Sequence, residues 1–317
     1  MKVDALWITG PRKIEVRSVE VSDPGYGEIQ VEVKACGICA GDRALYKSAD
    51  AQNTCPFRFG HEPSGIVLKV GPGVTGFNPG DNVACNGADA MAQVVNVPAV
   101  DSVVISRPVD DYAVWIMEPV VCIVKSVANV PITPGDDIVL IGAGYMGLLK
   151  TQALAKTLRG RLTVFDLEDR KLELAKKYGA EETYNANSAN GRQALEKIVE
   201  NGGVPLVIEC SGEESGFEAA NKCIQPSGIL ELFGWQRSVC SFDGTPWHIG
   251  GIRVFNSAPG IDHNPNNRIN QTEKLMSQGV FDQKDLITHR INYKQANEAH
   301  EIAVARADGY IKGVITF

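Results

Sequence analysis

The sequence lacks the features that identify several large classes of protein. Its 31 basic residues do not outnumber its 38 acidic ones, so there is no basic surplus with which to bind nucleic acid. No apolar run approaches the roughly 20 residues of a membrane span, and residues 1–10 lack the apolar stretch and cleavage site of a signal peptide. Of its eight cysteines only Cys36 and Cys39 are closely spaced, which does not indicate a disulfide scaffold. We therefore expect a cytoplasmic protein that binds neither nucleic acid nor membranes.

The 317 residues show no compositional bias and, at roughly 150 residues per domain, predict about two domains. The first hundred residues contain short β segments separated by turns. Residues 29–34 alternate apolar and polar side chains with a period of two, and residues 65–70 resemble them. This part of the chain predicts an irregular β barrel or sandwich.

After Glu118 the sequence changes to alternating helical and strand patterns. An amphipathic helix at 168–178 ends at Gly179, as expected of a C-terminal cap. Strands that alternate with helices predict a parallel, doubly wound sheet. We expect helices at 119–128, 146–158, 168–178, 271–278 and 294–307, and strands at 137–141, 162–166, 206–209, 229–233 and 311–317.

A glycine-rich turn follows one of these strands directly and opens a helix. Gly142, Gly144 and Gly147 form a G-x-G-x-x-G, whose context is stronger evidence than the glycines alone. The first glycine permits the turn, the second lets a pyrophosphate approach, and the third allows close packing of helix and strand. Asp166, 19 residues after Gly147, ends the next strand, where its carboxylate can bind an adenosine ribose. The pattern predicts a dinucleotide site that favours NAD over NADP.

Four side chains before this turn could bind a metal: Cys39, His61, Glu62 and Glu118. Thiolate, imidazole and carboxylate are the ligands that zinc prefers, and a catalytic site uses three of them with one position left open. Spacing alone leaves other interpretations open. A single cysteine or histidine is more often structural, and Cys36 with Cys39 could be a redox C-x-x-C.

Several motifs occur together in one order along the chain. They are GICAGD at 37–42, GHEPSGIVLKVG at 60–71, NPGDNV at 78–83, MEPVVC at 117–122, the glycine turn, VIECSG at 207–212 and DLITHR at 285–290. This set resembles the zinc-dependent medium-chain alcohol dehydrogenase family over essentially the whole chain. The Glu-Pro of MEPVVC is closest to its polyol and threonine dehydrogenase branch. The resemblance implies an α/β protein with a GroES-like β-rich catalytic domain, residues 1–120 and 263–317, and a Rossmann NAD-binding domain, residues 121–262.

The resemblance also implies roles for individual residues. It assigns zinc to Cys39, His61, Glu62 and Glu118, with Cys36 a bystander and Asp42 orienting the ligating imidazole. It places Lys312 on the cofactor pyrophosphate and Cys210-Ser211-Gly212 on the nicotinamide side. The implied cofactor-binding residues are Gly142, Gly144, Tyr145, Met146, Gly147, Asp166, Cys210, Ser211 and Lys312.

Two departures from the family pattern concern the proton path. Gly41 stands where a serine or threonine often passes on the alcohol proton, and Ala44 stands where a histidine commonly ends the relay. Glu62, Glu118, a water chain or Tyr46 would have to substitute. A third departure is that residues 80–98 contain only Cys85 where most zinc members bind a structural zinc through four cysteines. We therefore expect a single, catalytic zinc site.

The expected function is NAD-linked oxidation of a secondary hydroxyl of a polyol, cyclitol or sugar. The alternatives are an L-threonine 3-dehydrogenase, a simple secondary alcohol dehydrogenase, or an inactive NAD-binding regulatory protein. Family resemblance further implies a homodimer or homotetramer that pairs through the last strand of the nucleotide-binding sheet, residues 252–256.

Overall fold

The computed structural model describes residues 1–52, 55–236, 239–257, 265–307 and 309–317. Contacts divide the chain into two units. Unit 1 comprises Met1–Val121 and Asn264–Phe317, and unit 2 comprises Cys122–His263. The expected second boundary, at residues 262–263, lies outside the described residues.

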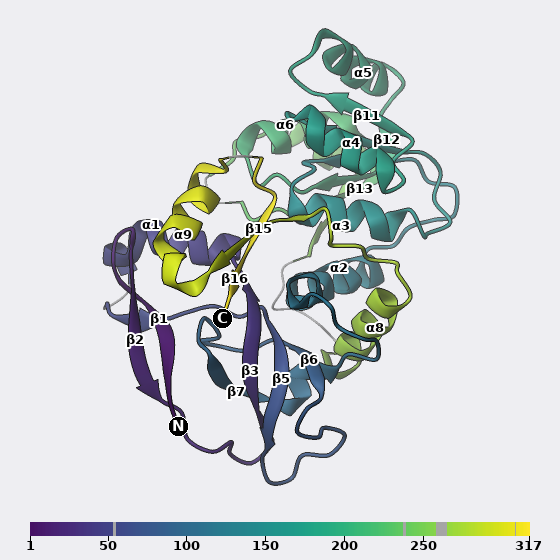
Figure 1. Ribbon diagram of the computed structural model, residues 1–317. Coiled ribbons are helices and arrows are strands. Elements are labelled where there is room, and N and C mark those ends of the chain that lie inside the picture. The colour runs from purple at the N-terminus through teal and green to yellow at the C-terminus, as the bar shows by residue number, and fades with distance from the viewer. Residues whose placement is uncertain (53–54, 237–238, 258–264, 308) are drawn as a thin grey trace. The chain divides into compact units, whose positions relative to one another are not determined.

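Unit 1 is built mainly from strands (Figure 1). A three-stranded sheet has the order β2-β1-β4, and a seven-stranded sheet has the order β15-β16-β3-β5-β6-β8, with β7 paired to β3. Its strands are β1 Lys2–Gly10, β2 Lys13–Glu20, β3 Glu28–Gly37, β4 Phe57–Arg58, β5 Pro63–Val70, β6 Asn82–Cys85, β7 Val94–Pro98, β8 Ser102–Val104, β15 Ile287–Asn292 and β16 Lys312–Thr316. Its helices are α1 Ala40–Gln52, α8 Pro265–Ser277 and α9 Ala296–Ala305, and α2 Glu118–Asn129 begins here and continues into unit 2.

The core of unit 1 follows from the alternation seen in its sequence. Ile29, Val31 and Val33 of β3 are buried, and they belong to one apolar cluster with side chains of β1, β5 and α9. The prediction of an all-β first hundred residues was wrong in one respect, because α1 follows β3. The α1 sequence has few regularly spaced apolar residues, so its periodicity gave little sign of a helix.

Unit 2 alternates strands and helices. Its strands are β9 Ile138–Ile141, β10 Leu162–Asp166, β11 Glu182–Asn185, β12 Val204–Glu209, β13 Ile224–Leu232 and β14 Arg253–Asn256. Its helices are α3 Tyr145–Leu154, α4 Asp169–Lys177, α5 Ala189–Glu200, α6 Glu214–Cys223 and α7 Thr245–Gly250. The predicted parallel, doubly wound sheet is confirmed, and Gly179 follows α4 with a φ of 104°.

The six parallel strands run in the order β11-β10-β9-β12-β13-β14. The strand order reverses between β9 and β12, because β10 pairs with one edge of β9 and β12 with the other. In such sheets ligands bind outside the carboxyl ends of the strands at this point. Val139, Ile141 and Val207 pack with Phe217 of α6 in one apolar cluster.

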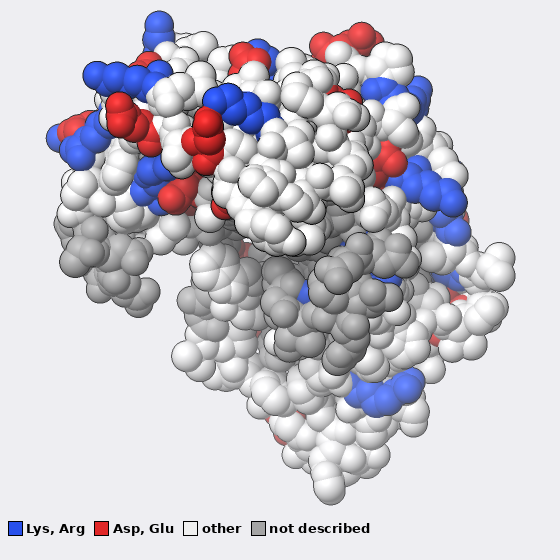
Figure 2. Space-filling model, turned by 90° about the horizontal axis from the view of Figure 1, so that it is seen from below, with Lys and Arg blue, Asp and Glu red and all other residues white. Residues whose placement is uncertain are grey.

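The surface charge agrees with the sequence, but one apolar stretch is longer than the sequence analysis indicates. On the face drawn in Figure 2, acidic and basic side chains are interspersed rather than separated by sign. The stretch Tyr112–Asn129 is long and apolar enough to cross a membrane, but 56% of it is buried inside the protein, as in many core helices. The expected cytoplasmic location stays a prediction.

Candidate metal centre and cofactor site

Cys39 stands at the N-terminus of α1, and backbone geometry fixes its position. The carboxylate of Asp42 accepts the N–H of Cys39 at 2.8 Å, and the N–H of Gly41 donates to Cys39 Sγ at 3.4 Å. A carboxylate that reaches back to the residue before a helix is the geometry of a capping box. The sulfur thus lies at the positive end of the helix dipole, where a negative charge is stabilised.

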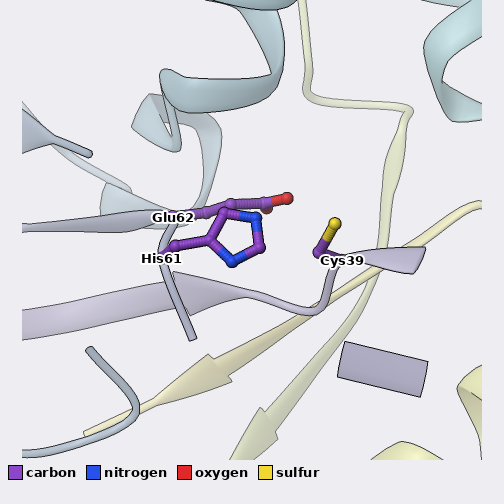
Figure 3. A group of neighbouring side chains, drawn as sticks. All are labelled: Cys39, His61 and Glu62. Carbon is purple, nitrogen blue, oxygen red and sulfur yellow. The ribbon is translucent and has the colours of Figure 1, made fainter. Parts of the chain in front are cut away.

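His61 and Glu62 come from the segment that leads into β5, and they face Cys39 (Figure 3). One ligand atom from each of the three residues lies within 4.8 Å of the other two. Among the described residues this is the one cluster of three or more potential metal ligands. Glu118, the first residue of α2, brings its Oε2 to 4.0 Å from Nε2 of His61. All four predicted metal ligands therefore belong to unit 1, and three of them form the cluster.

Glu62 has a buried lysine as its counterion. Nζ of Lys312, in β16, lies 2.8 Å from Oε1 and 2.6 Å from Oε2 of Glu62. A Cβ on Gly37 would lie 1.9 Å from Glu62 Oε2, so only glycine leaves room for this carboxylate. Lys312 is only 4% exposed, and its ammonium is already paired with Glu62. A contact from Lys312 to the cofactor pyrophosphate therefore stays a prediction, and the interaction that the structure contains is the pair with Glu62.

The electrostatic field around His61 favours a cation. The hydrogen bond to the Cys39 side chain is the largest effect that raises the pKa of His61, which reaches about 10 with help from the carboxylates of Glu62 and Asp42 and despite burial. For Asp42, in contrast, burial is the main cause of a raised pKa, which is about 6. The carboxylate of Asp42 accepts the backbone N–H of Cys39, so it fixes the backbone of the sulfur ligand, and it acts on His61 through its charge.

This donor set suits zinc. It combines a thiolate, an imidazole and carboxylates, and the three clustered atoms are close enough to bind a single ion. Cys36 does not join them, because it is fully buried and its burial raises the pKa of the thiol well above its ordinary value. Both Cys36 and Cys39 are free thiols in the structure.

Tyr46, a candidate proton carrier from the sequence, has a different partner. Its hydroxyl donates to Glu301 Oε1 at 2.9 Å, and Arg12 binds the same carboxylate at 2.9 Å through its Nε. Helices α1 and α9 contact each other at this point. The described contacts thus assign Tyr46 to the packing of these helices.

In unit 2, two of the three glycines in the turn are required by the chain itself. Gly142 has a φ of 99°, and a Cβ there would lie 2.7 Å from the backbone nitrogen of Ser211. A Cβ on Gly147 would lie 1.9 Å from the carbonyl oxygen of Gly142. Helix and strand therefore approach as closely as the sequence predicts.

Gly144 differs from both of them. Its φ is −65°, which any residue adopts, and a Cβ there would meet no atom within 4 Å. The chain therefore gives no steric reason for glycine at this position, which is the N-cap of α3. Space left at the N-terminus of a helix, beside its free N–H groups, is what a bound pyrophosphate requires.

Asp166 is fixed beside this turn. Its Oδ2 accepts the N–H of Ala143 at 2.6 Å, and its Oδ1 accepts the N–H of Leu167 at 2.8 Å. Oδ1 also accepts the N–H of Glu168 at 3.0 Å. The carboxylate thereby connects the glycine turn to the end of β10, and Oδ2 keeps one lone pair with which to bind a ribose hydroxyl. Tyr145 and Met146, the other predicted cofactor contacts, are the first two residues of α3.

Sequence reasoning missed a buried ion pair in unit 2. Nζ of Lys150, in α3, lies 3.0 Å from Glu231 in β13, and both side chains are almost completely buried. The hydroxyls of Ser126 and Ser257 also donate to Glu231. The available signal was the single charged residue in each of two short segments, Lys150 in 147–154 and Glu231 in the otherwise apolar segment 229–233.

Comparison with known proteins agrees with both units. Residues 25–105 match the family model for the alcohol dehydrogenase GroES-like domain, and residues 134–277 match the model for zinc-binding dehydrogenases. The chain belongs to the zinc-dependent medium-chain alcohol dehydrogenase family, in its polyol dehydrogenase branch, and is a zinc-dependent, NAD-linked dehydrogenase of alcohols or polyols.

Individual relatives cover nearly the whole chain. Sorbitol dehydrogenase of Bacillus subtilis is 26% identical and aligns with 92% of this chain and 91% of its own length. D-xylulose reductase of Scheffersomyces stipitis is 29% identical, with 93% of each chain aligned. The structure of galactitol-1-phosphate dehydrogenase from Escherichia coli shares the fold, with a TM-score of 0.85 and 21% identity over 99% of this chain and all of the other.

Proposed function

We propose that this enzyme oxidises a secondary hydroxyl of a polyol, cyclitol or sugar and transfers the hydride to NAD. The observation that carries the proposal is the ligand cluster of Cys39, His61 and Glu62, with Glu118 at 4.0 Å from His61. Glu118 is the glutamate of the Glu-Pro motif that resembles the polyol branch. Similarity to sorbitol dehydrogenase and D-xylulose reductase supports the same substrate class.

Two groups of residues would hold the two cofactors that the reaction needs. Cys39, His61 and one carboxylate would hold zinc, which supplies a Lewis acid that lowers the pKa of a hydroxyl group. The glycine turn, the N-terminus of α3 and Asp166 would hold NAD, which supplies the hydride acceptor. Lys312 pairs with Glu62, and the thiolate of Cys39 and the carboxylate of Glu118 would bring further negative charge to the metal position.

The solvent exposure of the two carboxylates indicates which of them replaces the missing proton relay. The side chain of Glu118 is 18% exposed, whereas that of Glu62 is 2% exposed and bound to Lys312. A proton that leaves the substrate must reach water, so we propose that Glu118 Oε2 accepts it. Gly41 and Ala44 have no group that could do so.

The experiment is a survey of NAD⁺ reduction by the purified enzyme over sorbitol, xylitol, myo-inositol, glucose, L-threonine and propan-2-ol. We expect a polyol, cyclitol or sugar to give the highest kcat/KM by at least tenfold. Fastest oxidation of propan-2-ol would contradict the substrate class but not the reaction. NAD binding without oxidation of any alcohol, in protein with zinc bound, would favour the regulatory alternative.

L-threonine is the second candidate substrate. An L-threonine 3-dehydrogenase of Marinomonas is 26% identical over 67% of this chain and 71% of its own length. The same survey decides between the two, because threonine carries an ammonium and a carboxylate that polyols lack.

We also propose that copies of the chain associate through β14. This strand is the last in the parallel sheet, and its Val254 is 40% exposed. An unpaired sheet edge with apolar side chains favours pairing with a second copy. Light scattering of wild type and of Val254→Lys tests this, and an unchanged mass in the variant would contradict it.

A further inference from the structure

A tryptophan stands half exposed where β13 ends. Trp235 follows the last residue of the strand, Leu232, by three positions, and 57% of its surface is accessible. Trp247, by contrast, belongs to an aromatic cluster with Phe217 and Phe242, and its Nε1–H donates to Asn221. Trp235 therefore differs from Trp247, because the indole of Trp235 is accessible to solvent.

The backbone at Trp235 is held against the loop that follows β12. A Cβ on Gly212 would lie 2.4 Å from the carbonyl oxygen of Trp235, so the two loops are in close contact. The N–H of Gly234 donates to the Glu209 carbonyl at 2.7 Å, and the side chain of Gln236 donates to the Glu209 carboxylate at 2.6 Å. Contacts on both sides thus fix the position of residue 235.

The loop after β12 is in turn packed on the glycine turn. Ser211 donates from its backbone N–H and its hydroxyl to Glu209, and its backbone nitrogen would lie 2.7 Å from a Cβ on Gly142. The loops that follow β9, β12 and β13 are therefore neighbours at the carboxyl edge of the sheet. Trp235 is at one end of this row, and Asp166 is at the other, after β10.

The direction of a bound dinucleotide follows from this row. Its pyrophosphate belongs at the N-terminus of α3, after β9, and its adenosine ribose at Asp166. The other nucleotide must then extend to the opposite side, over the loops after β12 and β13. Those two strands lie about 5 and 10 Å from β9 at the usual strand spacing.

We propose that the indole of Trp235 contacts the nicotinamide ring of the cofactor; the proposal rests on NAD being the cofactor. The chemistry suits the pair. The nicotinamide ring of NAD⁺ is flat and positively charged, and tryptophan is the side chain that binds aromatic rings and cations best through its face. Trp235 is thus a cofactor contact for the nicotinamide half, distinct from the residues that bind the adenosine half.

ADP-ribose provides the decisive comparison, because it contains the whole cofactor except the nicotinamide ring. The experiment measures Kd for NAD⁺ and for ADP-ribose by calorimetry on the full zinc-loaded chain, in wild type, Trp235→Ala, Trp235→Phe and Trp247→Phe. We expect Trp235→Ala to weaken NAD⁺ binding by roughly five- to thirtyfold and to leave ADP-ribose within about twofold. Trp235→Phe should lose less, and Trp247→Phe should change neither ligand.

A second readout does not depend on affinity. Energy transfer from tryptophan to the reduced nicotinamide of bound NADH should fall strongly in Trp235→Phe and persist in Trp247→Phe. Unchanged NAD⁺ affinity in Trp235→Ala would overturn the proposal, as would an equal loss for ADP-ribose, or a change confined to the KM of the alcohol. Failure of wild type to bind both NAD⁺ and ADP-ribose would instead refute the cofactor.

Discussion

Each of the two units buries a lysine–glutamate ion pair, and the two pairs have different surroundings. In unit 2, Glu231 is bound by Lys150 and by the hydroxyls of Ser126 and Ser257. In unit 1, Glu62 is bound by Lys312 and lies within the cluster of potential metal ligands. The first carboxylate is surrounded by donors from its own chain, whereas the second can also bind a cation.

The comparison shows that burial of charge alone does not identify a functional site. Both pairs are nearly inaccessible to water, so removing one partner from either leaves an uncompensated buried charge. What distinguishes the unit 1 pair is the presence of Cys39 and His61 beside its carboxylate. A cation bound by these ligands would add positive charge beside Glu62 and not beside Glu231.

Lys150→Met is expected to have the largest effect on stability. It should reduce the free energy of unfolding by about 3–5 kcal/mol, because Glu231 is then left charged and buried without its counterion. The double variant Lys150→Met/Glu231→Leu should recover most of this loss. Urea denaturation measures all three proteins, and a double variant no more stable than the single one would contradict the ion-pair account.

Lys312→Met should behave like Lys150→Met only when zinc is absent. Without metal we expect a loss of similar size, since Glu62 is buried as deeply. Saturating zinc should reduce the difference from wild type by more than half, because the ion replaces the missing positive charge. Zinc should not rescue Lys150→Met. Equal rescue of both variants, or of neither, would contradict the distinction between the two pairs.

Acid should destabilise unit 1 through His300. This side chain is fully buried, and burial lowers its pKa to about 4 from an ordinary value of 6.5. Below pH 6.5 the unfolded chain therefore takes up a proton that the folded chain does not, so stability falls as the pH drops towards 4, by up to about 3 kcal/mol. His300→Leu should show a correspondingly flatter pH dependence of the urea midpoint, and an unchanged slope would argue against it.

The glycine turn allows a comparison within unit 2 itself. Gly147→Ala should reduce stability by about 1–3 kcal/mol, because its Cβ would overlap the Gly142 carbonyl. Gly144→Ala should change stability by less than about 1 kcal/mol, but weaken NAD⁺ binding at least tenfold by filling the space meant for pyrophosphate. Calorimetry on Gly144→Ala checks this, and wild-type affinity would show that no ligand needs that space.

The parts of the protein that were predicted correctly depend on local patterns. The strand from 162 to 166, the glycine turn and the helix ending at Gly179 all follow from periodicity and turn chemistry within short segments. Cys39, His61 and Glu62 were selected by residue type and family resemblance, and the structure brings them together.

The rest depends on contacts between distant segments. Lys312 is 250 residues from Glu62, and nothing local at either position predicts that they pair. The same applies to Lys150 and Glu231, 81 residues apart. Helix α1 was missed because its apolar residues are not regularly spaced. The hydrogen bond between the Asp42 carboxylate and the N–H of Cys39, which stabilises the start of the helix, is seen only in the structure.

The most direct test of the account is bound zinc together with NAD⁺ reduction in wild type, Cys39→Ala and the matched control Cys36→Ala. We predict that wild type and Cys36→Ala retain zinc and turnover, while Cys39→Ala loses both, its rate falling by roughly a thousandfold or more because the Lewis acid is lost. Chelation of wild type should reproduce the loss, and added zinc should reverse it. Normal zinc content and turnover in Cys39→Ala would contradict the assignment of this metal centre.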